Sequence, residues 1–259
     1  MGETNLDTQL DTAAQIVAEA SYVIALVGAG MSKESGIPTF RGGDGLWDKH
    51  GEPPMDGYQR FLADPAQWWA ARLAEQEKMG EFTKAIEAAR PNAGHVALAD
   101  MEREGFLQHV ITQNIDNLHQ LAGSSRITEI HGNRTKMRCI ECSRRWPRED
   151  FRSEEVPPRC PDCGGLVKGD TVMFGEPIPR DALEECSRQA QYADVCLLIG
   201  TSAIVYPAAE YPAIVYRRGG KLIEINPQAT PYSDVCAAVL RAPSGEALPA
   251  LLERVVASS

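Results

Sequence analysis

The sequence has no apolar run that approaches the roughly 18 to 20 residues needed to cross a membrane. It also lacks a secretory signal, because the opening residues MGETNLDTQLD are polar and acidic, and a complete myristoylation motif, because Leu6 stands where Ser or Thr is required. Basic residues are outnumbered, 26 to 36, and the net charge is −10. This balance argues against a surface that coats nucleic acid and would attract a lysine-rich partner. We expect a cytoplasmic globular protein with no membrane partner.

Internal repeats and low-complexity tracts are also missing, and 259 residues suit one large domain or one domain with an insert. Short runs rich in Val, Ile and Leu alternate with amphipathic stretches. Strands that are apolar on both faces and separated by helices predict an α/β fold, in which a parallel sheet has helices on both faces and binds ligands at its carboxyl edge. The expected strands are Tyr22–Val27, His109–Thr112, Val195–Ile199 and Leu222–Ile225, and the expected helices are Leu10–Ala20, Pro65–Gln76, Asn92–Arg103, Asp181–Gln191 and Ala208–Arg218.

Two segments interrupt this alternation. Residues 41–90 are rich in Gly, Pro and Trp, and residues 134–172 hold four paired cysteines among Arg, Lys, Pro and Gly. Both are typical of insertions. We therefore expect a single domain, with a large lobe from residues 1–40, 91–133 and 173–259 and a smaller lobe from the two insertions.

Four of the seven cysteines form two C-x2-C pairs separated by 17 residues, namely Cys139 with Cys142 and Cys160 with Cys163. Four thiolates complete a tetrahedral Zn²⁺ site and leave no position for water, so one structural zinc ion is expected. A redox dithiol is the weaker alternative, because two pairs are present and turn residues frame both. The other three, Cys186, Cys196 and Cys236, are expected to be buried small apolar residues.

The first predicted strand runs into the segment 28–32 (GAGMS). Glycines at this point let the backbone approach a phosphate, and the N–H groups of a following helix can bind it. The dinucleotide fingerprint would need a third glycine where Lys33 stands, so a simple tight turn remains an alternative. Further along, Phe40 beside Arg41 suits stacking on a ring together with a phosphate contact.

Polar side chains follow the other predicted strands as well, in the segments 113–116 (QNID) and 200–202 (GTS) and at Asn226. Each alone could be a turn or a helix cap. Polar ends on every strand of one sheet instead favour a shared polar crevice. His131, which follows a short β-branched run and precedes a glycine, is expected beside the same edge, although a lone histidine is more often structural.

Together these motifs resemble the sirtuins. The resemblance covers about residues 20–250 and implies a Rossmann-like lobe that binds NAD, a small lobe with a helical insert and a four-cysteine zinc site, and a cleft between them for NAD and an acyl-lysine protein substrate. The matching segments, in family order, are 28–41 (GAGMSKESGIPTFR), 112–116 (TQNID), 131–133 (HGN), the four paired cysteines, 174–176 (FGE), 200–202 (GTS) and 225–227 (INP).

The resemblance also implies roles for individual residues at the cofactor. The expected contacts to the phosphates are Gly28, Ala29 and Arg41, with Gly30 and Ser32 beside them. The expected contacts to the nicotinamide half are Phe40 over the reactive ribose, Gln113 at a ribose hydroxyl, and Asn114 and Asp116, with Ile115 between them, at the ribose and carboxamide. The expected contacts to the adenosine half are Gly200, Thr201, Ser202, Asn226 and Ser244.

The implied reaction removes an acyl group from a protein lysine. The acyl oxygen would attack the anomeric carbon as nicotinamide departs, with Asn114 and Asp116 at that centre. His131 would then act as the general base through the ribose hydroxyls, a task that suits an imidazole titrating near neutrality. The products would be nicotinamide, free lysine and an acyl-ADP-ribose. Substrate backbone would pair as an added strand with Phe174, Gly175 and Glu176.

The expected acyl group is acetyl or a longer neutral chain. Relatives that prefer succinyl or malonyl groups carry a Tyr and, three residues on, an Arg in the helical insert. Alignment through Asp64 places Arg72 and Glu75 at these positions, and Glu75 would repel an acyl carboxylate.

Two alternatives remain. An NAD-dependent mono-ADP-ribosyltransferase or NAD glycohydrolase would use the same reactive centre with another nucleophile or water, but His131 favours deacylation, because simple nicotinamide cleavage needs no such base. A zinc ribbon that binds nucleic acid is the less favoured alternative, since no aromatic stacking series accompanies its basic residues. Those residues are Lys136, Arg138, Arg144, Arg145 and Arg148.

Overall fold

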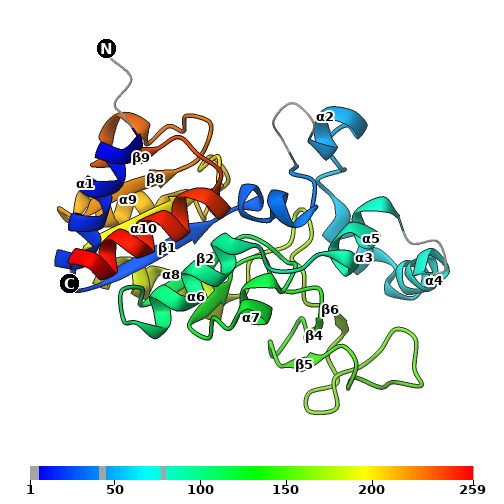
Figure 1. Ribbon diagram of the computed structural model, residues 1–259. Helices are drawn as coiled ribbons and strands as arrows, with labels where there is room; N and C mark the ends of the chain where they lie inside the picture. The colour runs from blue at the N-terminus through cyan, green and yellow to red at the C-terminus, as the bar shows by residue number, and fades with distance from the viewer. Residues whose placement is uncertain (1–5, 41–44, 77–79, 259) are drawn as a thin grey trace.

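The computed structural model describes residues 6–40, 45–76 and 80–258. Within them the large lobe is built on a six-stranded parallel sheet, drawn on the left of Figure 1. The chain runs outward in both directions from β1 and β7, which are neighbours, and this reversal opens a crevice at the carboxyl ends of the two strands. The spatial order is β3 (Ile127–Glu129), β2 (His109–Thr112), β1 (Val23–Val27), β7 (Val195–Ile199), β8 (Lys221–Ile225) and β9 (Ala238–Leu240).

Helices cover both faces of this sheet, as the sequence predicts. On β1, Val23, Ala25 and Val27 pack toward one set of helices, and Ile24 and Leu26 pack toward the other. All five side chains are buried, which is why the strand is apolar throughout. The first set is α1 (Leu6–Glu19), α6 (Ala93–Arg103) and α10 (Ser244–Ser258), and the second is α8 (Arg180–Tyr192) and α9 (Glu210–Arg217).

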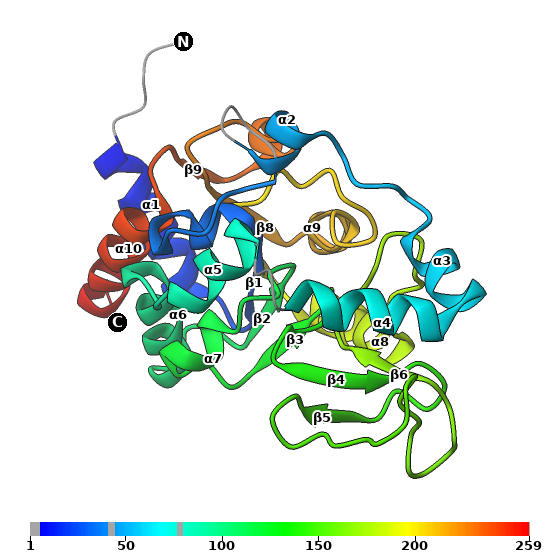
Figure 2. The ribbon, with the colours of Figure 1, turned by 90° about the vertical axis from the view of Figure 1, so that its right-hand side faces the viewer.

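The smaller lobe joins the two insertions. Trp69 on α4 packs with Met137 and Val167 of the cysteine-containing segment, and its indole N–H donates to the Val167 carbonyl at 3.2 Å. Figure 2 shows α4 alongside the small antiparallel sheet, whose order is β5-β4-β6. The elements of this lobe are α2 (Leu46–His50), α3 (Gly57–Ala63), α4 (Pro65–Gln76), β4 (Lys136–Cys139), β5 (Arg145–Pro147) and β6 (Val167–Gly169).

The remaining elements lie in the large lobe or pack against it. Helix α5 (Glu81–Ala88) ends the first insertion but packs against the large lobe, through Ile86 on Ile37 and Leu118. The short helix α7 (Leu118–Ala122) lies beside α6, and two 3-10 helices occupy Ala29–Ser35 (η1) and Ser233–Val235 (η2). Across the described ranges, no helix combines the length and the apolar character needed to span a membrane.

Candidate active site

A cavity of about 1500 Å³ lies at the carboxyl edge of the sheet and extends between the lobes. It is lined from the large lobe by η1, by the segments after β2, β7 and β8, and by the start of α10. From the small lobe it is lined by α3, α4 and the segment after β6. The sequence-predicted residues on its wall are Gly28, Ala29, Gly30, Ser32, Phe40, Gln113, Asn114, Ile115, Asp116, His131, Gly200, Thr201, Ser202, Asn226, Ser244, Phe174, Gly175, Glu176 and Arg72.

Two of the predicted site residues have side chains outside the described part of the structure. Arg41 lies outside the described residues. Glu75 belongs to α4, but its side chain also falls outside the described part.

The glycine segment after β1 is packed backbone to backbone against Gly200. The Gly30 N–H donates to the Gly200 carbonyl at 2.8 Å, and a Cβ on Gly30 would lie 2.7 Å from that same oxygen. Gly200 itself has φ +55°, and a Cβ there would lie 2.4 Å from the Met31 nitrogen. Only glycines permit this approach. It brings η1 and the β7 end together on one wall, as a dinucleotide-binding crevice requires.

A buried hydrogen-bonded cluster stands next to η1. Asp116 accepts from the Ser32 hydroxyl at 2.7 Å through one oxygen and from the Leu118 N–H at 2.9 Å through the other. The Asn114 amide donates to the Gly28 carbonyl at 3.0 Å and to Ser32 at 3.1 Å. Burial raises the pKa of Asp116, although the hydrogen bonds from Leu118 and Ser32 to its carboxylate oppose the rise. One oxygen of Asp116 thus accepts from the first N–H of α7, and the other accepts from Ser32 in the glycine segment.

A hydrogen bond to the main chain orients the imidazole of His131. Its Nδ1 lies 3.1 Å from the main-chain oxygen of Gln113, and because a carbonyl can only accept, Nδ1 carries the proton. The Nε2 atom is then the basic nitrogen. Burial lowers the pKa of His131, while the bond to Gln113 opposes this, so the ring is neutral at pH 7 and able to take a proton.

The far end of the cavity is organised around Thr201. Its hydroxyl accepts from the Gln113 amide at 2.9 Å, and its carbonyl accepts from the Asn226 amide at 2.8 Å. Ser244 begins α10, where the carboxylate of Glu34 accepts from the Gly245 N–H at 2.7 Å. Short hydroxyl and amide groups thus line this end, which suits ribose and adenine.

A row of aromatic rings that the sequence did not reveal runs along one wall of the cavity. The rings of Phe40 and Trp47 are 5.3 Å apart, and those of Trp47 and Phe174 are 5.7 Å apart. They link the cofactor segment to the expected peptide segment. The Tyr58 N–H donates to the Phe174 carbonyl at 3.0 Å. Further wall residues that sequence reasoning missed, since isolated apolar and basic residues carry no motif, include Met55, Trp68, Trp69, Arg148, Val205 and Tyr206.

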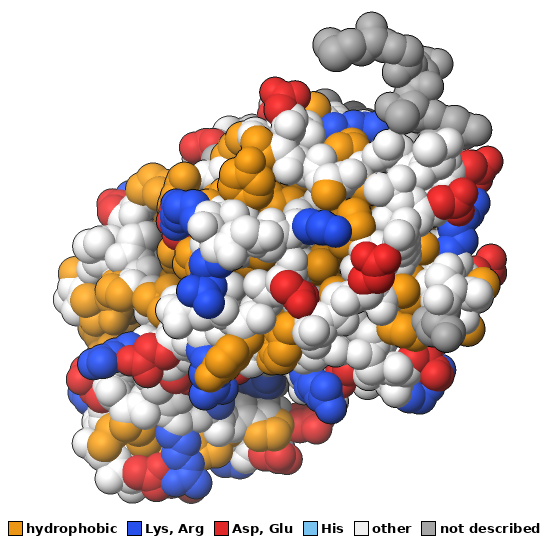
Figure 3. Space-filling model, turned by 90° about the vertical axis from the view of Figure 1, so that its left-hand side faces the viewer, with side chains coloured by type: hydrophobic (Ala, Val, Ile, Leu, Met, Phe, Trp, Pro, Cys, Tyr) orange, Lys and Arg blue, Asp and Glu red, His pale blue; other side chains and the backbone are white. Residues whose placement is uncertain are grey.

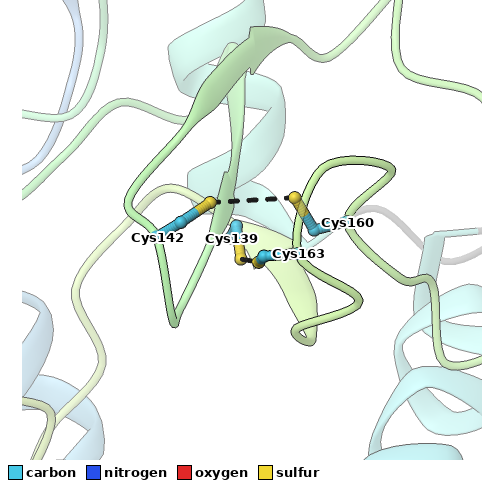
Figure 4. A group of neighbouring side chains, drawn as sticks. All are labelled: Cys139, Cys142, Cys160 and Cys163. Atoms are coloured by element: carbon cyan, nitrogen blue, oxygen red, sulfur yellow. Dashed lines mark hydrogen bonds between the residues drawn. The ribbon is translucent and has the colours of Figure 1, made fainter.

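The four paired cysteines converge, as Figure 4 shows, and their sulfur atoms lie within 4.8 Å of one another. The Sγ atoms of Cys139 and Cys163 are 3.5 Å apart, and those of Cys142 and Cys160 are 3.7 Å apart. A tetrahedral zinc ion with bonds of about 2.3 Å would hold its sulfurs about 3.8 Å apart. The donor set and its spacing therefore fit zinc. Of the other cysteines, Cys186 and Cys196 are buried, while Cys236 is only partly so.

The basic residues near the cysteines do not form a nucleic-acid surface. Arg138 is buried against Asp170 and Glu176, Arg145 pairs with Asp170 and Asp181, Lys136 pairs with Glu129, and Arg144 pairs with Asp162. Figure 3, which views the molecule from the side of the large lobe, shows acidic and basic side chains interspersed, with no continuous basic patch on that face. Four of the five cations are thus neutralised by carboxylates.

Comparison with known proteins agrees with this geometry. The family model described as "Sir2 family" matches residues 28–207. An NAD-dependent protein deacylase of Thermococcus kodakarensis is 44% identical over 252 residues, which cover 95% of each chain. A solved Sir2 homologue–NAD complex is 40% identical, with a TM-score of 0.77, and the match covers 95% of this chain and 93% of that one.

A second solved structure, a Sir2 complex with a deacetylated p53 peptide and 3′-O-acetyl-ADP-ribose, is 35% identical with a TM-score of 0.74. The match covers 93% of this chain and 96% of that one. The family model spans most of the glycine segment, the cysteine pairs and the cavity wall, and the relatives match over almost their whole length. This chain therefore belongs to the Sir2 family, the sirtuins.

Proposed function

We propose that this chain is an NAD-dependent protein-lysine deacetylase, which transfers the acetyl group from lysine to ADP-ribose and releases nicotinamide. The observation that carries the proposal is His131. Its Nδ1 is anchored on Gln113, and its basic Nε2 belongs to a ring on the same cavity wall as η1, Asn114 and Asp116. Family membership and relatives named as NAD-dependent deacylases and deacetylases support it.

NAD would lie along the carboxyl edge, with its phosphates against the glycine segment and its adenosine between Thr201, Asn226 and Ser244. The backbone approach at Gly30 and Gly200 supports this placement. When bound, NAD supplies an anomeric carbon whose bond to nicotinamide can be broken. The chain's own contribution at that point is the pair Asn114 and Asp116, which the Ser32 hydroxyl bridges by hydrogen bonds.

His131 would take the proton from the ribose hydroxyls after nicotinamide has left. An imidazole whose pKa is lowered by burial is unprotonated at neutral pH and so is ready for this step. Phe40, whose ring is partly exposed at the wall, would cover the reactive ribose. The turn at Phe174, Gly175 and Glu176 would hold the peptide backbone.

The zinc ion would be structural, since its four thiolate ligands come from the chain and leave no open position. Cysteines that serve as metal ligands or thiols rather than in disulfides are typical of a reducing compartment, so we place the protein in the cytoplasm. Its substrates would be acyl-lysine proteins, which its acidic charge would attract.

The test is product analysis by mass spectrometry after incubation with NAD and an acetyl-lysine peptide. Acetyl-ADP-ribose and free lysine in equal amounts are expected. ADP-ribose without deacetylation would indicate an NAD glycohydrolase, and a peptide that gains ADP-ribose would indicate an ADP-ribosyltransferase.

A further inference from the structure

A cluster of four buried charges lies between the small antiparallel sheet and the turn Met173–Glu176. Arg138 on β4 and Lys168 on β6 meet Asp170 and Glu176, and the side chains are only 0% to 4% exposed. Burying charges is expensive, and apolar residues of similar size often give equal or greater stability. The cluster therefore calls for an explanation other than stability.

Arg138 divides its guanidinium between two carboxylates. Its Nε donates to Asp170 at 3.0 Å, and its Nη2 donates to Glu176 at 2.5 Å. The second oxygen of Asp170 accepts from the Asn133 N–H at 3.0 Å, and the Val172 N–H donates to the His131 carbonyl at 2.9 Å. One branch of Arg138 thus leads to the backbone that carries the general base.

The backbones at Gly132 and Asp170 are closely packed. A Cβ on Gly132, directly after His131, would lie 2.1 Å from the main-chain oxygen of Asp170. The base segment and the segment after β6 are therefore in direct contact, and a shift of Asp170 must move the segment that carries His131.

The other branch leads to the peptide turn, and Lys168 reinforces it. The Lys168 ammonium donates to the carbonyls of Gly169 at 3.0 Å and Thr171 at 2.8 Å, and lies 2.9 Å from Glu176. These three partners use all of its protons. Glu176 also accepts from the Met173 N–H at 2.8 Å, so its carboxylate closes the turn. The side chain of Glu176 is thus buried, and Arg138 and Lys168 tie it to the small lobe.

We infer that Arg138 and Lys168 are positioning residues for the acyl-lysine peptide. They fix the distance between the segment that carries His131 and the turn Met173–Glu176, without touching either ligand. The inference rests on the proposed deacetylase function. Because the glycine segment and Thr201 lie outside the cluster, NAD binding should not depend on it.

The test compares Lys168→Met and Arg138→Lys with the wild type. The matched control is Arg144→Met, which removes a cation from the same module but from an exposed ion pair with Asp162. Zinc content, thermal unfolding, NAD dissociation constant and acetyl-peptide kinetics are measured for each. We expect zinc and NAD binding to be retained and kcat/KM for the peptide to fall at least about tenfold, because misplacement of a reacting group by about 1 Å can cost on the order of 10².

Because Lys168→Arg keeps the cation beside Glu176, it is expected to retain more of the peptide kcat/KM than Lys168→Met. If Lys168→Met fails to fold, Glu176→Gln provides the second test, since its amide oxygen can still accept from the Met173 N–H while the carboxylate charge is lost. Folded variants with wild-type peptide kinetics, or with NAD affinity falling in parallel, would overturn the inference. An inactive wild type would instead overturn the proposed function.

Discussion

The Nδ1 atom of His131 lies 3.1 Å from the main-chain oxygen of Gln113. The side chain of Gln113, which follows β2, donates to the hydroxyl of Thr201, which follows β7 on the other side of β1. One residue, Gln113, thus contacts both the His131 ring and the Thr201 end of the cavity. Since the Gln113 carbonyl belongs to the backbone, substitution of the Gln113 side chain would leave the tautomer of His131 unchanged.

His131→Ala should abolish release of free lysine while NAD still binds. Loss of a positioned general base costs on the order of 10² to 10⁴ in rate. Nicotinamide cleavage, which relies on Asn114 and Asp116, should suffer less, so labelled nicotinamide should still exchange into NAD when acetylated peptide is present. The ratio of exchange to deacetylation in variant and wild type is the measurement. Equal losses, with NAD affinity intact, would place His131 before or during cleavage.

Gly200→Ala should weaken NAD binding at least about tenfold, because the new Cβ would displace the backbone of the glycine segment. Gly36→Ala is the matched control. Gly36 also has a positive φ, +85°, but a Cβ there meets nothing within 4 Å. Both variants should lose roughly 1 kcal/mol of stability from backbone strain, and Gly200→Ala should lose more because of its close contact with Met31. Calorimetric titration with NAD separates them, and similar affinities in the two variants would contradict the assigned phosphate site.

Cys142→Ser should lose zinc and unfold the small lobe. Three thiolates leave an open site, and two of the ligands, Cys139 and Cys160, are part of the core that this segment shares with α3 and α4. The zinc content and the circular dichroism signal of secondary structure should both fall together with activity. A variant that kept its thermal stability and secondary structure but lost activity would show that the metal acts in catalysis.

Acetyl peptides should be preferred over succinyl peptides by at least about tenfold in kcat/KM, since an acyl carboxylate needs a paired cation in the pocket. Arg72 lines the cavity, but it is exposed and its guanidinium lies 5.7 Å from the centre of the Trp68 ring. A panel of acyl-lysine peptides tests this. Comparable values that become unequal in Arg72→Leu would identify Arg72 as a carboxylate receptor and refute the expected preference.

Stability should fall as pH drops below about 6.5. The rings of His95 and His119 are 4.9 Å apart and buried, and burial lowers their pKa values to about 4 and about 3. Because these pKa values are below that of an unfolded histidine, the unfolded state takes up protons first as pH falls. At pH 5.5 this costs roughly 1.4 kcal/mol per histidine. Thermal unfolding from pH 7.5 to 5.5 should therefore show a shallower decline in His119→Leu, whatever its absolute stability, and an unchanged slope would contradict the assignment.

The central strands and the zinc ligands were predictable because each has a strong local signal. The interior strands β1 and β7 are apolar on both faces, β2 and β8 are largely apolar, and the cysteine pairs have the spacing of zinc ligands. Of the edge strands, β3 was indicated only as a short β-branched run before His131, and β9 was missed, since each has three residues and no sustained pattern. The strands of the small sheet were missed for a related reason, because polar residues such as Lys136 and Arg145 occupy them.

Contacts across long sequence distances could not be predicted. Ser32 and Asp116 are separated by 84 positions, and only the pairing of β1 with β2 brings them together. The basic residues after position 134 gave a misleading signal, because the sequence does not show which carboxylates neutralise them. For Arg138 these partners are Asp170, near the end of the second insertion, and Glu176, just after it.

The central position of β1 has a consequence while the protein is being made. β1 pairs with β2 on one side and with β7 on the other. Residues 195–199 leave the ribosome long after residues 23–27, at synthesis rates of roughly 5 to 20 residues per second. Until then β1 is an apolar strand with an open edge, which is a template for aggregation. Nascent or truncated chains that end before β7 should therefore aggregate, whereas chains that extend through β7 can close that edge.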